Sequence, residues 1–337
     1  MSRTVFVTGA SGFLAKHIVL QLLQKGDSVV GSLRSPKRAD EVRAAITDAG
    51  GSVENLRFVT LDLTSDDGWA DAMTGCDALI HTASPFPLAQ PKDEMDLIRP
   101  AVEGTLRALK AAVASGVPRV VLTSSIAAVS WMDPPTDRKF DERDWSDPDA
   151  KGISAYSKSK TLAERAAWDF VKGAGASLRL TTINPAFVLG CPLDPHPGSS
   201  ISLISRMLAG KDPMVPNLGF SVVDVEDVAE AHVRALDVDA SIGQRIIAAS
   251  DTMWFVDMTK ALKAEYPDRR IPTRVAPTFV LRFLALFDAS IRGILPSLGR
   301  DDQFSNAKAH DMLGINFTPA RDALLKAARY LVKNDLV

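Results

Sequence analysis

Short apolar runs alternate with stretches of helical periodicity through the first part of the chain. The runs are rich in Val, Leu and Ile and lie at 4–8, 28–33, 56–61, 77–82 and 119–124. Their polar and apolar residues alternate poorly, which is typical of strands that helices cover on both faces. The pattern therefore predicts an α/β fold with a doubly wound parallel sheet.

Two further stretches predict long helices. One helix is predicted over 94–115, where Asp93 is placed to cap the N-terminus, Gly116 follows the C-terminus, and Pro100 is expected to kink the helix. The other is predicted over 279–295. Charged residues interrupt its apolar stretch, so it is expected to be amphipathic and not to span a membrane.

The second half of the chain indicates a change of lobe. Strands are predicted over 178–184 and 245–250, and a strand that runs into a helix is predicted over 220–236. Between them Gly, Pro and Ser accumulate over 192–200, which is typical of a loop. From residue 251 onwards the pattern is mainly helical.

Composition and charge narrow the functional classes. The 337 residues carry 39 basic and 41 acidic side chains, so the net charge of −2 gives no electrostatic basis for binding nucleic acid. The length fits one large domain or two closely associated ones. Cys76 and Cys191 are too few for a disulfide framework, and the chain opens in a predicted strand without a signal sequence. A cytoplasmic protein is therefore expected.

A glycine-rich turn follows the first predicted strand. In the sequence TGASGFLA, Gly9, Gly12 and Ala15 recur at intervals of three. Glycines there let the backbone approach a pyrophosphate, and free N–H groups at the start of the next helix attract its negative charge. The turn indicates a dinucleotide site. A tight strand-to-helix turn with a purely structural role is the alternative.

The second predicted strand ends in GSLRSPKR, at the point where an NAD site would carry an acidic residue. Ser32, Arg34 and Arg38 instead offer hydrogen-bond donors and positive charge for a 2′-phosphate, and the first carboxylate comes only at Asp40. NADP(H) is therefore favoured over NAD(H) as the cofactor. The alternative is a solvated basic loop without a ligand.

Tyr156 and Lys160 are four residues apart in the sequence AYSKSK and so share one face of a predicted helix. An ammonium group beside a phenol lowers the pKa of the phenol and makes it a usable acid or base near neutral pH. Ser125 ends the fifth predicted strand, and ligands of doubly wound sheets bind at that edge. The three side chains are therefore expected to meet in one catalytic site, with Ser124 as the alternative to Ser125.

The motifs TGASGFLA, LDL, HTAS, TSS, YSKSK and NPAFVLG follow one another along the chain. In this order they resemble the extended short-chain dehydrogenase/reductases, and more closely the group of dihydroflavonol reductases, cinnamoyl-CoA reductases and yeast methylglyoxal reductases. The resemblance covers essentially the whole chain. It implies a Rossmann-type sheet with a smaller, mainly helical C-terminal substrate lobe.

The resemblance and the change of lobe together imply two parts. Residues 1–183 are expected to form an NADP-binding Rossmann domain, to which residues 220–250 return. Residues 184–219 and 251–337 are expected to form the substrate-binding lobe. The pattern carries no signal for an oligomeric state.

The resemblance also implies roles for individual residues. Ser125 and Tyr156 would hydrogen-bond a substrate carbonyl, and Lys160 would bind the nicotinamide ribose and tune the tyrosine. The cofactor contacts expected from the resemblance and from the two loops are Thr8, Gly9, Ser11, Gly12, Phe13, Leu14, Ser32, Arg34, Arg38, Asp62, Leu63, His81, Thr82, Ala83, Tyr156, Lys160, Pro185, Val188 and Ser200.

Two features depart from the relatives. Many extended members carry N-V-x-G-T before the fifth strand, whereas this chain has A-V-E-G-T, which leaves open whether Glu103 replaces the asparagine in a proton relay. Sugar-nucleotide epimerases usually follow their serine with V-Y-G, whereas this chain has S-I-A-A-V-S-W-M. Arginines that would clamp a sugar nucleotide are not evident either. These features weaken the epimerase alternative.

Phe86, Trp131, Met132 and Phe187 follow predicted strand ends and are the candidates for an apolar substrate pocket. Ordinary packing is the alternative for each. The five histidines and two cysteines lack the spacing of metal ligands, so no metal site is expected.

The sequence thus predicts an NADPH-dependent carbonyl reductase that transfers hydride between nicotinamide and an aldehyde or ketone, with Tyr156 as the proton donor. The reverse alcohol oxidation is equally accessible. The expected partner is a small-molecule carbonyl or alcohol substrate, and neither nucleic acid nor a membrane. The alternatives are a nucleotide-sugar epimerase or dehydratase and a non-catalytic NADP(H)-sensing protein.

Overall fold

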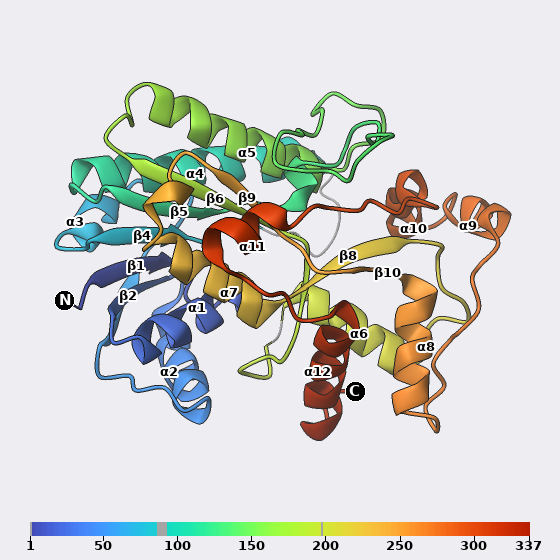
Figure 1. The fold of residues 1–337 in the computed structure, drawn as a ribbon. Helices are drawn as coiled ribbons and strands as arrows, with labels where there is room; N and C mark the ends of the chain where they lie inside the picture. Colours follow the sequence, from blue (N-terminus) through green and yellow to red (C-terminus); the bar gives the residue numbers. More distant parts are fainter. Residues whose placement is uncertain (1, 86–92, 197) are drawn as a thin grey trace.

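Seven parallel strands form the central sheet, in the order β3-β2-β1-β4-β5-β6-β9 (Figure 1). They are β1 (Thr4–Thr8), β2 (Ser28–Leu33), β3 (Leu56–Thr60), β4 (Ala78–His81), β5 (Arg119–Thr123), β6 (Arg179–Pro185) and β9 (Arg245–Ala248). This computed structural model describes residues 2–85, 93–196 and 198–337. Each strand coincides with a predicted apolar run, and the doubly wound parallel sheet is confirmed.

Helices cover both faces of the sheet because its strands are apolar on both faces. Val5 and Val7 pack into one buried cluster, and Phe6 between them packs into another on the opposite face. The first layer holds α1 (Phe13–Gln24), α2 (Ala39–Asp48), α7 (Val225–Ala235) and α11 (Ala307–Leu313), and the second holds α3 (Trp69–Met73), α4 (Met95–Ala114) and α5 (Ala155–Lys172). Short 3₁₀ turns lie at Pro36–Arg38, Ile126–Ala128, Asp239–Ser241 and Leu295–Ser297.

The strand order reverses between β1 and β4, which pair side by side at the middle of the sheet. Strands β2 and β3 follow on one side, and β5, β6 and β9 on the other. The loops after β1 and β4 therefore diverge and leave a crevice at the carboxyl ends of the strands, which is where open α/β sheets bind their ligands.

A second lobe surrounds a three-stranded sheet in the order β10-β8-β7. Its elements are β7 (Phe187–Leu189), β8 (Gly219–Asp224), β10 (Thr252–Trp254), α6 (Ser199–Leu208), α8 (Phe255–Glu265) and α12 (Ala320–Lys333). They enclose an apolar cluster of their own. Residues 220–250 are shared between the two lobes, since β8 lies in the small sheet while α7 and β9 belong to the main sheet and its helical layer.

The prediction of one helix over 279–295 is wrong, because the segment forms two short helices, α9 (Thr278–Leu284) and α10 (Ala289–Ile294). Polar contacts explain the break. The side chain of Asp288 accepts a hydrogen bond from the N–H of Ile291 and starts a new helix. Arg292 donates to the carbonyl of Ala285 and thereby stabilises the end of the preceding one.

Helix α4 matches its predicted span, although Glu94 occupies the N-cap one residue later than predicted. Asp93 still accepts a hydrogen bond from the N–H of Met95, at 2.9 Å. Pro100 lies inside the helix. In the part of the chain that the structure describes, no helix combines the length and the apolar character needed to cross a membrane.

Candidate active site

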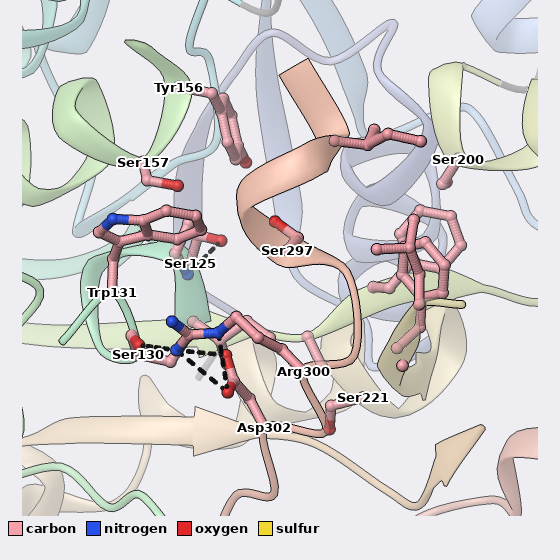
Figure 2. Close-up of a pocket in the computed structure, with 18 of the residues that line it drawn as sticks. Ser125, Ser130, Trp131, Tyr156, Ser157, Ser200, Ser221, Ser297, Arg300 and Asp302 are labelled. Atoms are coloured by element: carbon pink, nitrogen blue, oxygen red, sulfur yellow. Dashed lines mark hydrogen bonds and ion pairs between the residues drawn. The ribbon is translucent and has the colours of Figure 1, made fainter. Parts of the chain in front are cut away.

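Ser125 and Tyr156 both line a cavity of about 600 Å³ (Figure 2). Ser125 lies two residues after the end of β5 and caps the 3₁₀ turn Ile126–Ala128, accepting a hydrogen bond from the N–H of Ala127 at 3.1 Å. Tyr156 lies in the first turn of α5, which Ser154 caps. Both side chains line the same cavity, and the hydroxyl of Ser125 is close enough to Tyr156 to affect the pKa of its phenol. The structure thus brings together two of the three predicted catalytic side chains directly.

Lys160 lies one turn further along α5, with its Nζ 5.9 Å from the centre of the Tyr156 ring. Burial lowers the pKa of Lys160 to about 8, and the nearby carboxylate of Glu164 opposes this shift. Burial also raises the pKa of Tyr156, and the neighbouring hydroxyl of Ser125 opposes that shift. The predicted lowering of the Tyr156 pKa is therefore outweighed by burial, and the phenol carries its proton at neutral pH.

The structure settles which of the two adjacent serines faces the cavity. The hydroxyl of Ser124 donates to the carboxylate of Glu164 at 2.6 Å, inside the protein. Ser125 lines the cavity and contacts Tyr156. Ser125 is therefore the serine that can reach a substrate.

Glu164 was not a candidate from the sequence, yet it fixes the segment of Ser124 and Ser125 through buried polar contacts. Its side chain is fully buried and forms an ion pair with Arg245 at 2.7 Å. The amide of Asn184 donates to Glu164 at 2.8 Å and to the carbonyl of Ser125 at 3.1 Å. The available signal was its position four residues after Lys160, which puts a carboxylate on the inward face of the helix.

Glu103 does not take part in this arrangement. It lies exposed on α4, whereas Ala101, the residue aligned with the asparagine of N-V-x-G-T, is buried and has no polar side chain. Helix α4 therefore supplies neither the asparagine nor a carboxylate substitute for it, and a relay through Glu103 is not supported.

A second cavity, of about 550 Å³, is lined by the glycine-rich turn at the start of α1. Gly9 has a φ of 65°, and a Cβ there would lie 3.1 Å from that of Ala83. A Cβ at Gly12 would lie 3.2 Å from the carbonyl oxygen of Gly9, and no side chain caps α1. The turn therefore forms a cradle that fits a pyrophosphate and that added side chains would fill.

The end of β2 lies beside this cradle. The hydroxyl of Ser32 accepts a hydrogen bond from the N–H of Gly9 at 3.1 Å, which ties the two loops together. Arg34 is exposed and lines the cavity. Arg38 does not line it, because its side chain pairs with Glu41 at 2.9 Å. Arg34 is thus the better placed of the two arginines to meet a 2′-phosphate.

The other predicted cofactor residues divide into three groups. Those that line the second cavity with Gly9, Gly12, Ser32 and Arg34 are Ser11, Phe13, Leu14, Asp62, Leu63, Thr82 and Ala83. Thr8 and His81 are buried beneath it, where the Thr8 hydroxyl and His81 Nδ1 lie 2.8 Å apart. Val188 and Ser200 line the cavity of Tyr156, and Pro185 is buried at the end of β6.

The walls of the Tyr156 cavity are largely apolar. The predicted residues Trp131 and Phe187 line it, together with Leu203, Phe220 and Phe304. Met132 is not among its lining residues, and its side chain is exposed. Phe86 lies outside the described residues.

An arginine also lines this cavity, although none was evident from the sequence. Arg300 reaches it from the loop after α10 and pairs with Asp302 at 3.1 Å. Within residues 2–85, 93–196 and 198–337, no group of three or more His, Cys, Asp or Glu side chains is placed to hold a metal ion.

Comparison with known proteins identifies reductases among the relatives. Cinnamoyl-CoA reductase 1 of Petunia hybrida is 34% identical over 333 residues, which cover 98% of this chain and 92% of that protein. Tetraketide alpha-pyrone reductase 1 of Arabidopsis thaliana is 36% identical over 278 residues, 80% of this chain and 83% of that one. The solved structure of the yeast methylglyoxal/isovaleraldehyde reductase Gre2 complexed with NADPH has a TM-score of 0.80 at 29% identity, over 99% and 100% of the two chains.

The family itself follows from a match that covers most of the chain. The model of the NAD dependent epimerase/dehydratase family matches residues 5–248, from the first strand of the main sheet to its last. The predicted resemblance to extended short-chain dehydrogenase/reductases is confirmed. The chain belongs to the NAD dependent epimerase/dehydratase family.

Proposed function

We propose that this chain is an NADPH-dependent reductase that converts the carbonyl group of an aldehyde or ketone into an alcohol at Tyr156. One observation carries the proposal: Ser125 and Tyr156 line the same largely apolar cavity, and Lys160 lies one turn from Tyr156 on the same helix. The relatives are reductases and the yeast structure holds NADPH, which confirms the predicted enzyme class and cofactor over the epimerase alternative.

The residues at the glycine-rich turn fit such a cofactor. Gly9 and Gly12 would approach its pyrophosphate, Arg34 would pair with its 2′-phosphate, and Lys160 would bind its nicotinamide ribose. When bound, the cofactor supplies the hydride. One carbonyl, one NADPH and one proton then give one alcohol and one NADP⁺.

The chain's own side chains supply the proton and hold the carbonyl oxygen. The hydroxyl of Ser125 and the phenol of Tyr156 would both donate to that oxygen, and the phenol would transfer its proton as the alcohol forms. The raised pKa of Tyr156 keeps this proton in place beforehand. Lys160, whose pKa is about 8, is mostly charged at neutral pH and would stabilise the phenolate that remains.

The presence of Ser125, Tyr156 and Lys160 together supports an enzyme rather than an NADP(H)-sensing protein, because binding alone does not require a proton donor. The aromatic and aliphatic walls favour carbonyl substrates with an apolar body over nucleotide sugars. The cytoplasmic location stays a prediction from the sequence.

The test is NADPH consumption by the purified protein with a panel of aldehydes, ketones and nucleotide sugars. We expect turnover of aldehydes or ketones, with the alcohol as the product. Epimerisation or dehydration of a nucleotide sugar, without reduction of any simple carbonyl compound, would contradict the proposal. Binding of NADPH without turnover of any member of the panel would favour the sensing protein.

A further inference from the structure

The cavity of Tyr156 has a polar group at its far end. Figure 2 shows Tyr156 at one end and the pair of Arg300 and Asp302 at the other, with Ser125 between them. The guanidinium of Arg300 lies 5.1 Å from the centre of the Trp131 ring, so aromatic surface borders the charge. A substrate whose carbonyl group is at Tyr156 would therefore extend along apolar walls toward an ion pair.

Backbone contacts fix Arg300 at this place. Gly219 of β8 donates its N–H to the carbonyl of Arg300 at 3.2 Å, and a Cβ at Gly219 would lie only 2.8 Å from that oxygen. The absence of a side chain at Gly219 thus lets the segment of Arg300 cross the small sheet closely. Arg300 also donates to the carbonyl of Ser130 at 2.9 Å, which ties it to the loop of Trp131.

One nitrogen of this guanidinium remains available to a ligand. Nε and Nη2 donate to the carboxylate of Asp302, and Nη2 also donates to the carbonyls of Ser130 and Met132. Among the described residues Nη1 has no hydrogen-bond partner, and it is not sealed from solvent. In Figure 2 it is the nitrogen without a dashed line and points away from Asp302. The two N–H groups of Nη1 are therefore the part of Arg300, a lining residue of the cavity, that is left for a ligand.

The charge of Asp302 determines to which kind of substrate oxygen these N–H groups would donate a hydrogen bond. Asp302 already balances the charge of Arg300, with contacts of 3.1 and 3.2 Å to Nη2. A carboxylate on the substrate would find no uncompensated positive charge and would be repelled by Asp302. A neutral ether, hydroxyl or carbonyl oxygen would accept a hydrogen bond without that repulsion.

From this arrangement we infer that Arg300 selects substrates carrying a second, neutral oxygen at the end remote from the reacting carbonyl, and that Asp302 excludes anionic analogues. The inference rests on the proposed reductase function and specifies its substrate class. The compounds it favours have an apolar body, a carbonyl group at one end and an oxygen acceptor at the other.

The test uses three aldehydes that differ only at the remote end: 3-(4-methoxyphenyl)propanal, 3-(4-ethylphenyl)propanal and 3-(4-carboxyphenyl)propanal. The saturated linker keeps the remote group from changing the reactivity of the aldehyde. The readout is the ratio of kcat/KM values between two aldehydes within one protein, because such a ratio does not depend on the fraction of folded enzyme. The wild type is expected to prefer methoxy over ethyl by about tenfold, the effect of one charge-assisted hydrogen bond.

Two variants separate the roles of the ion pair. Arg300→Leu removes the donor, so the methoxy-to-ethyl ratio should fall to about one. Asp302→Asn keeps the shape of the site and removes the balancing charge, so the carboxy-to-methoxy ratio should rise by about tenfold over wild type. Gln303→Leu, a neighbour whose side chain contacts Asp301 instead, is the control and should leave both ratios unchanged.

A wild-type methoxy-to-ethyl ratio near one, or a ratio that Arg300→Leu leaves unchanged, would overturn the role of Arg300. An unchanged carboxy-to-methoxy ratio in Asp302→Asn would overturn the role of Asp302. If none of the three aldehydes, nor any other simple carbonyl compound, is reduced, the proposed function itself fails, which is a different result from reduction without selectivity.

Discussion

At the residue scale, the proton donor is the most direct point to test. Replacing Tyr156 by Phe removes the hydroxyl that contacts Ser125 but leaves the glycine-rich cradle intact. We expect kcat to fall by roughly 10²–10⁴-fold while the Kd for NADPH stays nearly unchanged. Steady-state kinetics and a fluorescence titration of NADPH measure the two quantities. Tyr266→Phe, remote from both cavities, is the matched control, and near wild-type turnover by Tyr156→Phe would contradict the assignment.

The choice of cofactor also depends on a single residue. Arg34 lines the cavity beside the glycine-rich turn. Arg38, four residues later, does not line this cavity and pairs with Glu41. Because a guanidinium–phosphate contact contributes about 1.5–3 kcal/mol, Arg34→Ala should raise the Kd for NADPH by about 10–100-fold and leave that for NADH nearly the same. Arg38→Ala is the control and should have a much smaller effect. Equal increases in the Kd values for NADPH and NADH in Arg34→Ala would exclude a contact between Arg34 and the 2′-phosphate.

At the scale of elements, the segment of Arg300 crosses β8 beside the cavity of Tyr156. A methyl group at Gly219 would lie 2.8 Å from the carbonyl of Arg300, so Gly219→Ala must displace that segment. We expect kcat/KM for the best carbonyl substrate to fall by roughly 10–100-fold, because a displacement of about 1 Å in a site reduces rates by this order. The affinity for NADPH should not change. Gly173→Ala, where the nearest atom is 3.9 Å away, serves as the control. An unaffected kcat/KM would show that the crossing does not shape the cavity.

The elements also show where sequence reasoning succeeds. The strands of the main sheet are predictable because each is an apolar run buried on both faces, and Val5 and Phe6 illustrate this by packing on opposite sides. The position of the candidate site at their carboxyl ends follows, since Ser125 lies two residues after β5 and Tyr156 lies in the first turn of α5.

What escaped prediction depends on contacts between distant segments. Arg300 enters the cavity only because Gly219 allows two remote backbones to approach, and no local pattern signals that approach. Similarly, the break between α9 and α10 depends on single polar contacts of Asp288 and Arg292 within a stretch whose apolar content favours a continuous helix. Periodicity reports burial, whereas these features depend on individual hydrogen bonds.

At the scale of the whole molecule, α1 is linked to the second lobe by buried polar contacts. Lys16 of α1 forms an ion pair with Asp194, and both side chains are almost completely buried. The neighbouring His17 contacts the carbonyl of Cys191 through Nε2 at 3.0 Å. Both partners lie on the loop that leads to α6, whose Ser200 and Leu203 line the cavity of Tyr156. The two lobes are therefore held together at the first turns of α1.

Three buried histidines, one of them at this link, make the stability of the molecule sensitive to acid. Burial lowers the pKa of His17 to about 4, of His81 to about 3 and of His232 to about 4, against an ordinary value near 6.5. Below about pH 6.5 the unfolded chain binds protons that the folded chain does not, so the free energy of unfolding must fall as the pH decreases.

The expected size follows from the three groups together. Each histidine lowers the free energy of unfolding by about 1.4 kcal/mol for every unit by which the pH falls. The three together should lower it by about 4 kcal/mol per unit between roughly pH 6 and pH 4.5. Urea denaturation followed by circular dichroism at several pH values measures this slope. His232→Gln should lower the slope by about one third, whereas His310→Gln, at a side chain that is 62% exposed, should leave it unchanged. A free energy of unfolding that stays constant between pH 6.5 and pH 5 would show that these histidines become protonated within the folded protein, and the buried, neutral state assigned to them would be wrong.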